Sequence, residues 1–326
     1  MADVRRPPDR CPSGGRSGND DRGQLLLVGA LALAVVFVAL ALLLNTAIYT
    51  GTLATRDSGV EATPAIEYVS ASQRAGVDAI ASVNRRNNSS ANDLNRAFNA
   101  TMGRWDDLAS HHRAVAGDAT DTDVTRITNG TRIQQDDAGR NFTNDSDAAN
   151  WTVVSGVSGV RSMRFTVEAS TLADDPADLL ADEVYHLTVT SGAGTRTVFV
   201  YDTPSGPEIR VDDGGAETTC AAGSVTDGTF VVDIPNESVG GASCPALGPV
   251  DSTSGSTSIE YDDAGAVAGT YTMVVDEPPA ALSLSGVSAA GSGSPYWTYA
   301  VYSAELDVSY RTGELDYAAT VEVVPE

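Results

Sequence analysis

The spacing of apolar and polar positions changes along the chain, and the first pattern is an unbroken apolar run. Residues 25–44, "LLLVGALALAVVFVALALLL", include no charged residue. As a helix this run is about 30 Å long, which is the thickness of the hydrocarbon core of a bilayer. Because backbone in lipid must satisfy its own hydrogen bonds, we expect a transmembrane helix over residues 23–50.

Two alternatives to a permanent anchor remain open for this run. A secretory signal has a shorter apolar region before its cleavage site, and Asn45-Thr46-Ala47 matches such a site weakly. The other alternative is the stem of a filament subunit. Arginines are concentrated before the run, and only Arg56 follows it closely. The excess of positive charge places the N-terminus in the cytoplasm and the rest of the chain outside.

The next pattern is the spacing of three and four that indicates amphipathic helices. The first stripe consists of Ile66, Val69, Gln73, Val77 and Ile80. The second stripe consists of Leu94, Phe98, Met102, Trp105, Leu108, His112 and Val115. Asn92 is the expected N-cap of the second helix. The dense Asp, Asn and Thr residues that follow, over 117–150, predict a loop or short strands.

From Trp151 onward apolar residues recur at every second position, as in strands with one buried face. The segments 163–167 and 271–275 show this alternation clearly. Two hairpins are expected, one over residues 185–201 around "SGAGT" and one over residues 306–323 around "RTGE". One polar and one apolar face indicate antiparallel sheets.

These patterns predict an α+β protein, with an N-terminal transmembrane helix and helical stalk, then an extracellular antiparallel β-rich head. The expected segments are a disordered cytoplasmic tail or leader (1–22), the transmembrane helix (23–50), the helical stalk (51–116), a polar loop region (117–150) and the β-rich head (151–326).

The charge composition narrows the range of partners. All 20 basic residues are arginine, 44 residues are acidic, and the net charge is −24. Such a charge repels nucleic acid, so we expect no nucleic-acid partner. In molar salt most of the self-repulsion is screened. Abundant acid without lysine resembles the proteins of extremely halophilic archaea; an ordinary acidic protein is the alternative.

The three cysteines fall on both sides of the apolar run. Cys11 lies in the short N-terminal tail, where we expect a free thiol. Cys220 and Cys244 lie on the side expected to be outside, where oxidation to a disulfide is possible. The alternative is a pair of buried free thiols. A metal site is not expected, because neither cysteine has the Cys or His neighbours that such a site needs.

Glycosylation sequons are also confined to the side expected to be outside. The eight Asn-x-Ser/Thr sites are Asn87, Asn88, Asn99, Asn129, Asn141, Asn144, Asn150 and Asn236. This enrichment is typical of a glycosylated surface protein. General richness in Ser, Thr and Asn is the alternative explanation.

Candidate chemistry is sparse in this sequence. His111 and His112 are adjacent in the second helix and diverge, and we expect His112 in the core and His186 exposed on a strand. The acidic segment 118–123 has carboxylates for calcium but lacks the glycine and distal glutamate of an EF-hand, so solvated side chains are the better interpretation. We expect no metal site, no cofactor and no enzymatic activity.

The junction Arg22-Gly23-Gln24-Leu25 resembles the class III signal of archaeal type IV pilin-like proteins. In that family a membrane peptidase cuts between the glycine and the residue after it, which implies Gly23 and Gln24 as the processing site. The family often has serine two positions after the Gln and an acidic residue four after it; here these are Leu26 and Val28. The opening also resembles uncharacterised haloarchaeal membrane-anchored surface proteins.

The sequence therefore favours a non-catalytic cell-surface protein, a pilin-like or minor-pilin-like subunit anchored by its N-terminal helix. The alternative is a membrane-anchored surface glycoprotein with a ligand- or partner-binding β domain and no filament role. The implied partners are the lipid bilayer and other pilin-like subunits, which small residues of the apolar helix would contact. The expected location is the cell membrane, crossed once, with the C-terminal domain outside.

Overall fold

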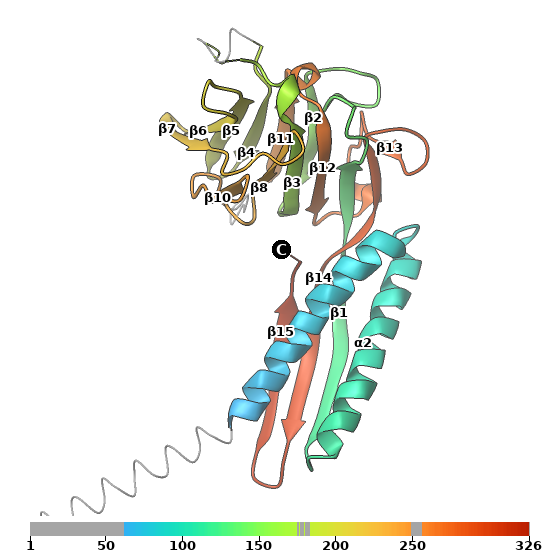
Figure 1. The fold of residues 1–326 in the computed structure, drawn as a ribbon. Coiled ribbons are helices and arrows are strands. Elements are labelled where there is room, and N and C mark those ends of the chain that lie inside the picture. Colours follow the sequence, from blue (N-terminus) through green and yellow to red (C-terminus); the bar gives the residue numbers. More distant parts are fainter. Residues whose placement is uncertain (1–61, 175, 177–178, 180–182, 249–255, 326) are drawn as a thin grey trace, which may run out of the picture. The chain divides into compact units, whose positions relative to one another are not determined.

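The computed structural model describes residues 62–174, 176, 179, 183–248 and 256–325. The chain divides into two compact units, Met1–Pro64 and Ala65–Glu326, and the account below concerns the second. Its described residues form two helices and two β-sheets, so the expected β-rich α+β fold with antiparallel sheets is confirmed (Figure 1). The apolar run and the expected transmembrane helix lie outside the described residues.

The two helices are consecutive and are joined by a short turn. The first covers residues 62–86, and the second, α2, covers Ala91–Ala114. The N-cap of α2 is Ser90, two residues before the expected Asn92; its Oγ accepts a hydrogen bond from the Asp93 backbone N–H at 3.1 Å. A serine hydroxyl that accepts from the third helical residue is a common N-terminal cap.

The buried face of helix 62–86 agrees only in part with the expected one. Ile80 is buried as expected, but Ile66 is 58% exposed. Tyr68 and Val83 are buried together with the small residues Ala65, Ser72, Gly76 and Ala79. A methyl group added at Gly76 would lie 2.9 Å from both terminal carbons of Val323, so the helix lies close to a strand at this position.

The strands form a nine-stranded and a six-stranded sheet. The nine-stranded sheet has the order β10 (Ala242–Ser243), β9 (Ser238–Val239), β8 (Thr229–Asp233), β3 (Val160–Glu168), β12 (Gly269–Val275), β1 (Ala119–Gln135), β14 (Tyr296–Arg311) and β13 (Ser288–Ala289), with β15 (Asp316–Val323) also paired to β14. The six-stranded sheet has the order β2 (Trp151–Val157), β11 (Thr257–Asp262), β4 (His186–Ser191), β5 (Gly194–Tyr201), β6 (Glu208–Asp213) and β7 (Ala216–Ala221). Short 3-10 turns lie at Ala169–Thr171, Ala264–Ala266 and Pro279–Ala281. Every named strand pair is antiparallel except β13 with β14.

Both expected hairpins are present in the structure. In β4–β5 the pair Ser191 and Gly194 encloses a two-residue turn. In β14–β15 the ladder runs from Arg311 opposite Asp316 to Ala304 opposite Val323. The alternation expected over 163–167 is also confirmed, since Met163, Phe165 and Val167 are all buried.

Over residues 117–150, where a loop or short strands were expected, the structure has one long strand followed by loops and turns. Residues 119–135 form β1, a strand of 17 residues that pairs with β14 along its length and with β12 at its end. Threonine is a good strand former, and long-range pairing to β14 and β12 supplies the burial that the local sequence lacks. Residues 136–150 contain loops and turns.

The two helices do not form a layer by themselves. Residues 119–128 of β1, residues 303–311 of β14 and strand β15 pair beside the two helices, so they complete a helix–sheet layer (Figure 1). The other ends of β1 and β14 belong to the sandwich, meaning the two sheets that share the larger core. Two long strands therefore run through both layers, and β-bulges at Val124/Arg126 and Thr128/Asn129 interrupt their pairing.

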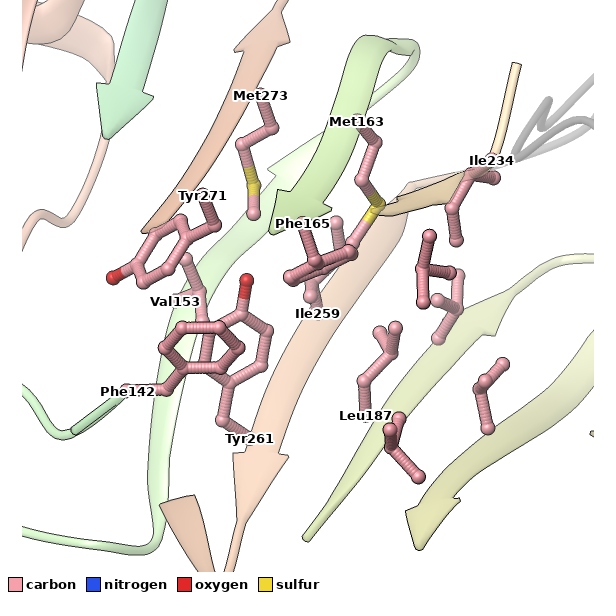
Figure 2. Packing of buried hydrophobic residues seen from close by; sticks show 14 of the residues in the cluster. Phe142, Val153, Met163, Phe165, Leu187, Ile234, Ile259, Tyr261, Tyr271 and Met273 are labelled. Carbon is pink, nitrogen blue, oxygen red and sulfur yellow. The ribbon is translucent and has the colours of Figure 1, made fainter. Parts of the chain in front are cut away.

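The sandwich core is rich in aromatic rings. The ring centroid of Phe142 lies 5.2 Å from that of Tyr271 in edge-on geometry (Figure 2). It lies 5.4 Å from the ring centroid of Tyr185 in the same geometry. Tyr261 contacts the same group. Burial raises the pKa of the Tyr185, Tyr261 and Tyr271 hydroxyls, so these groups stay neutral at ordinary pH.

Candidate functional site

The processing site expected at Gly23 and Gln24 lies outside the described residues, as does Cys11. Within residues 62–325 as described, no helix has the length and apolar composition needed to cross a bilayer. Helix 62–86 is the element through which residues 65–326 continue from the N-terminal region.

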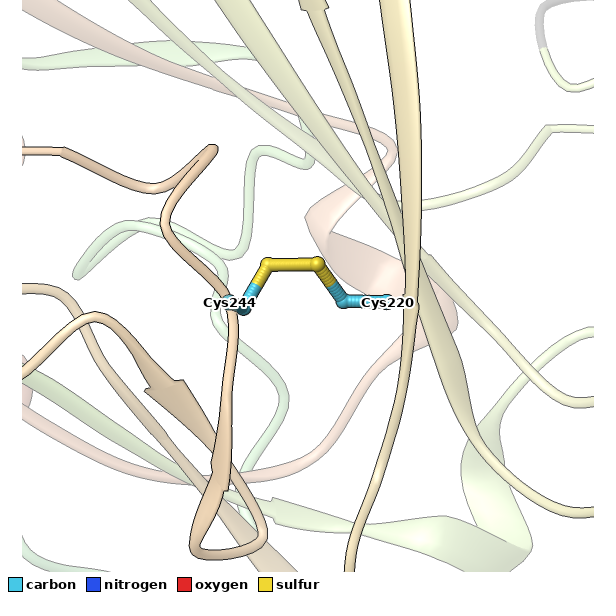
Figure 3. The surroundings of a disulfide bond; sticks show 2 residues. All are labelled: Cys220 and Cys244. Atoms are coloured by element: carbon cyan, nitrogen blue, oxygen red, sulfur yellow. A yellow bond between two sulfur atoms is a disulfide. The ribbon is translucent and has the colours of Figure 1, made fainter.

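Cys220 and Cys244 form a disulfide that joins the two sheets (Figure 3). Cys220 lies in β7, the outermost strand of the six-stranded sheet, and Cys244 follows β10, the outermost strand of the other. Their Cα atoms are 5.8 Å apart, and Cys244 is fully buried in the sandwich core. The bond therefore closes the end of the sandwich where each sheet would otherwise separate from the other.

The sequon asparagines fall into two groups by exposure. The exposed ones are Asn87, Asn99, Asn141, Asn150 and Asn236, and the half-buried ones are Asn88, Asn129 and Asn144. The Asn144 side-chain oxygen accepts hydrogen bonds from the backbone N–H groups of Ser146 and Ala148 at 2.9 and 2.8 Å, which fixes a turn. A glycan is bulky and needs an accessible amide, so the exposed group contains the better candidates.

The histidines do not occupy the environments expected for them. His112 is exposed rather than in the core, together with Leu108 and Val115, which are 74% and 85% exposed. A step of three residues falls short of a full helical turn, so the stripe rotates away from the sheet after Trp105. Ala109 occupies the inward position instead.

His186 is largely buried instead of exposed. Its side chain is 12% exposed, its ring centroid lies 4.9 Å from that of Phe199, and its Nδ1 lies 2.9 Å from the Val184 carbonyl oxygen. The neighbouring strands account for the difference, since Phe199 and Asp262 both lie directly opposite His186 in the sheet register.

The carboxylates of the acidic segment 118–123 do not lie together in the structure. Asp118 accepts a hydrogen bond from the Tyr310 hydroxyl at 2.7 Å, while Asp121 and Asp123 are exposed on the outer face of β1. Asp123 lies opposite Asp307 of β14. No group of three or more metal-binding side chains occurs in the part of the chain that the structure describes.

A polar network that the sequence did not indicate joins both helices to β1. The Tyr68 hydroxyl lies 3.1 Å from Thr122 Oγ1 and 3.5 Å from Asp106 Oδ1, and Ser72 Oγ lies 3.3 Å from the same threonine. Asp106 also accepts a hydrogen bond from the Thr122 backbone N–H at 2.8 Å. Burial raises the pKa of the Asp106 carboxyl, and the charge of Asp121 adds to the effect.

Asn84 provides a second polar link, at the end of helix 62–86. Its amide nitrogen donates to the Val301 carbonyl at 3.0 Å, and its oxygen accepts from the Val301 backbone N–H at 2.7 Å. These bonds satisfy the backbone of β14 between the segments paired with β13 and with β15, where no described strand pairs with this edge. Side-chain amides that replace a missing strand protect an edge from non-native pairing. In the sequence, only an asparagine directly after Val83 could have indicated this role.

Comparison with known proteins gives a partial match. The model of a family of unknown function, DUF7261, matches residues 19–165, which is just under half of the chain. Within the described residues, the matched segment includes both helices, β1, β2 and part of β3, but not the disulfide or the last hairpin. No curated protein matches the chain, and no solved structure matches it.

Proposed function

We propose that the protein is a non-catalytic cell-surface protein, a pilin-like or minor-pilin-like subunit whose N-terminal apolar helix anchors residues 62–326 outside the membrane. The Cys220–Cys244 disulfide carries this proposal. Disulfides persist in oxidising surroundings and are rare in the cytosol. Arginines before the apolar run and sequons after it support the same orientation.

The mass of the native N-terminus tests the pilin-like part of this proposal. Processing between Gly23 and Gln24 gives a mature chain that begins at Gln24. The variant Gly23→Val should retain the tail because the bulkier residue blocks the cut, whereas Gly29→Val, the same change inside the apolar run, should be processed normally. A native chain that begins after residue 44 would contradict both this proposal and the plain anchor.

A second candidate is a membrane-anchored surface glycoprotein with a ligand-binding β domain and no filament role. A polar groove on the nine-stranded sheet favours it. In this case the native chain retains residues 1–23, and the mass measurement separates the two candidates. Glycopeptide mapping then gives a further check, with occupancy expected at exposed sites such as Asn87 and Asn236 before half-buried sites such as Asn129.

A further inference from the structure

A groove of about 210 Å³ lies on the outer face of the nine-stranded sheet. Its walls come from three neighbouring strands and consist of Arg132, Gln134, Gln135, Asp136, Thr270, Tyr271, Thr272, Arg164 and Thr166. Gln134 lies opposite Thr272, which lies opposite Arg164, so these side chains form one row across the sheet. Sites for drug-sized ligands occupy about 300–1,000 Å³, so this groove fits a molecule of about one sugar ring.

Arg132 is the unusual residue of the groove. It is half-buried and forms no ion pair with the described residues, whereas Arg140 and Arg164 pair with Asp147 and Asp233. Its Nε donates to the Thr272 hydroxyl at 3.0 Å, which leaves the terminal nitrogens for another acceptor. Burial lowers the pKa of the Arg132 guanidinium, and the nearby charge of Arg85 lowers it further, whereas Tyr296 and the carboxylate of Asp136 act in the opposite direction.

An unpaired, half-buried guanidinium is costly in any protein and unexpected in one with a net charge of −24. Thr298 lies opposite Arg132 in the register, on the β14 side and outside the walls of the groove. The Arg132 guanidinium is therefore the group in the groove that calls for an external partner.

The remaining wall residues indicate which chemistry such a partner has. Thr166 and Thr270 present hydroxyls, Gln134 presents an amide, and Asp136 presents a carboxylate that already accepts from the Tyr296 hydroxyl at 2.8 Å. A guanidinium binds a carboxylate through parallel hydrogen bonds. Threonine, amide and carboxylate groups bind hydroxyls, and one acidic residue in the wall disfavours a multiply charged anion.

We propose that this groove binds a small hydroxylated carboxylate, a sugar acid or a hydroxy acid, through Arg132. The carboxylate pairs with the guanidinium, and the hydroxyls bond to Gln134, Asp136 and the threonines. The inference deepens the second candidate function, yet the groove lies within the described fold and its binding does not depend on how the N-terminus is processed.

Calorimetry of the full chain in detergent and molar salt tests the proposal with glucuronate, its methyl glycoside, lactate and glucose. We expect glucuronate or lactate to bind and glucose to bind at least about tenfold more weakly, because glucose lacks the carboxylate. Binding of the methyl glycoside with equal affinity identifies a glycan as the source of the acid, and its exclusion identifies a free acid. Absence of binding by all three acids overturns the proposal.

Variants at the groove separate recognition from folding. Arg132→Gln should weaken acid binding about tenfold or more, and Arg132→Lys should weaken it less because the charge remains. Arg104→Gln is the matched control, since Arg104 is exposed on α2 and also forms no ion pair with the described residues. Asp136→Asn should tighten acid binding by removing repulsion, a gain that misfolding does not produce. Unchanged affinity in Arg132→Gln, or equal binding of inorganic phosphate, overturns the inference.

Failure of acid binding leaves the N-terminal mass and the orientation of the chain unaffected. Failure of the orientation experiments likewise leaves the groove unaffected. The two proposals therefore stand or fall on separate measurements.

Discussion

The helix–sheet layer and the sandwich share the strands β1 and β14, but different contacts hold each of them together. In the helix–sheet layer a helix lies close to β15 at Gly76, and Asn84 and Asp106 bond directly to strand backbone. In the sandwich, aromatic residues fill the core and a disulfide joins the sheets. One layer thus depends on close fit and directional bonds, and the other on buried area and a covalent bond.

The largest expected effect comes from breaking the covalent bond of the sandwich. Cys220→Ser should lower the free energy of unfolding by about 3 kcal/mol. The bond joins residues with a sequence separation of 24 and thereby restricts the unfolded chain. Denaturant unfolding of the full chain, with and without reductant, measures this change. Cys11→Ser is the control and should have no effect. An unchanged unfolding midpoint under reductant would show that the bond does not stabilise the sandwich.

The next effect concerns the edge of β14 in the helix–sheet layer. Asn84→Ala leaves the backbone N–H and carbonyl of Val301 without their partners and should cost about 2 kcal/mol. Asn92→Ala, on the exposed surface of α2, should cost far less. Hydrogen exchange at the Val301 amide gives the local measure. Equal protection of this amide in wild type and Asn84→Ala would contradict the role assigned to Asn84.

A pair of helix glycines tests how closely helix 62–86 fits its sheet. Gly103→Ala in α2 meets no atom within 4 Å and should stabilise by about 1 kcal/mol through helix propensity. Gly76→Ala places a methyl against the stiff side chain of Val323 and should instead destabilise by about 1 kcal/mol. Thermal unfolding of both variants gives the comparison. A similar gain from each substitution would show that helix 62–86 does not lie closely against its sheet at Gly76.

The smallest effect is a pH dependence of the helix–sheet layer. Because the pKa of Asp106 is raised in the folded state, the folded chain holds a proton that the unfolded chain has released. The contribution of Asp106 to the free energy of unfolding is therefore greatest below about pH 4, which is the usual pKa range for Asp. This contribution falls as the pH rises through the raised pKa of the folded state. Asp106→Asn should flatten this dependence, whereas Asp78→Asn, at an exposed position of helix 62–86, should not. Urea unfolding across pH measures both.

The sequence predicted those elements whose burial follows from local alternation. Strands such as 163–167 and the hairpin "RTGE" carry their own inward and outward faces, so their periodicity was sufficient. β1 was missed because its burial comes from β12 and β14, which are distant in sequence. The contact face of helix 62–86 was predicted only in part, because the small residues Ala65, Ser72, Gly76 and Ala79 contribute to it and carry no hydrophobic signal.

The candidate sites follow the same division. The pairing of Cys220 with Cys244 needed only two cysteines alone on one side of the apolar run. The Arg132 groove and the Asp106 network combine residues from three elements each, and no local spacing marks them. His186 shows the same limit, since its burial depends on Phe199 and Asp262 across two strands.

The central claim is that residues 62–326 are displayed outside the cell, and labelling of cysteines in intact cells tests it most directly. With Cys220 and Cys244 held in their disulfide, an impermeant maleimide should label the variant Ala193→Cys before lysis, because Ala193 is exposed in the β4–β5 turn. Cys11 should remain unlabelled until lysis, or be absent where the leader has been removed. Labelling of Ala193→Cys only after lysis would contradict the claim and place the sandwich inside the cell.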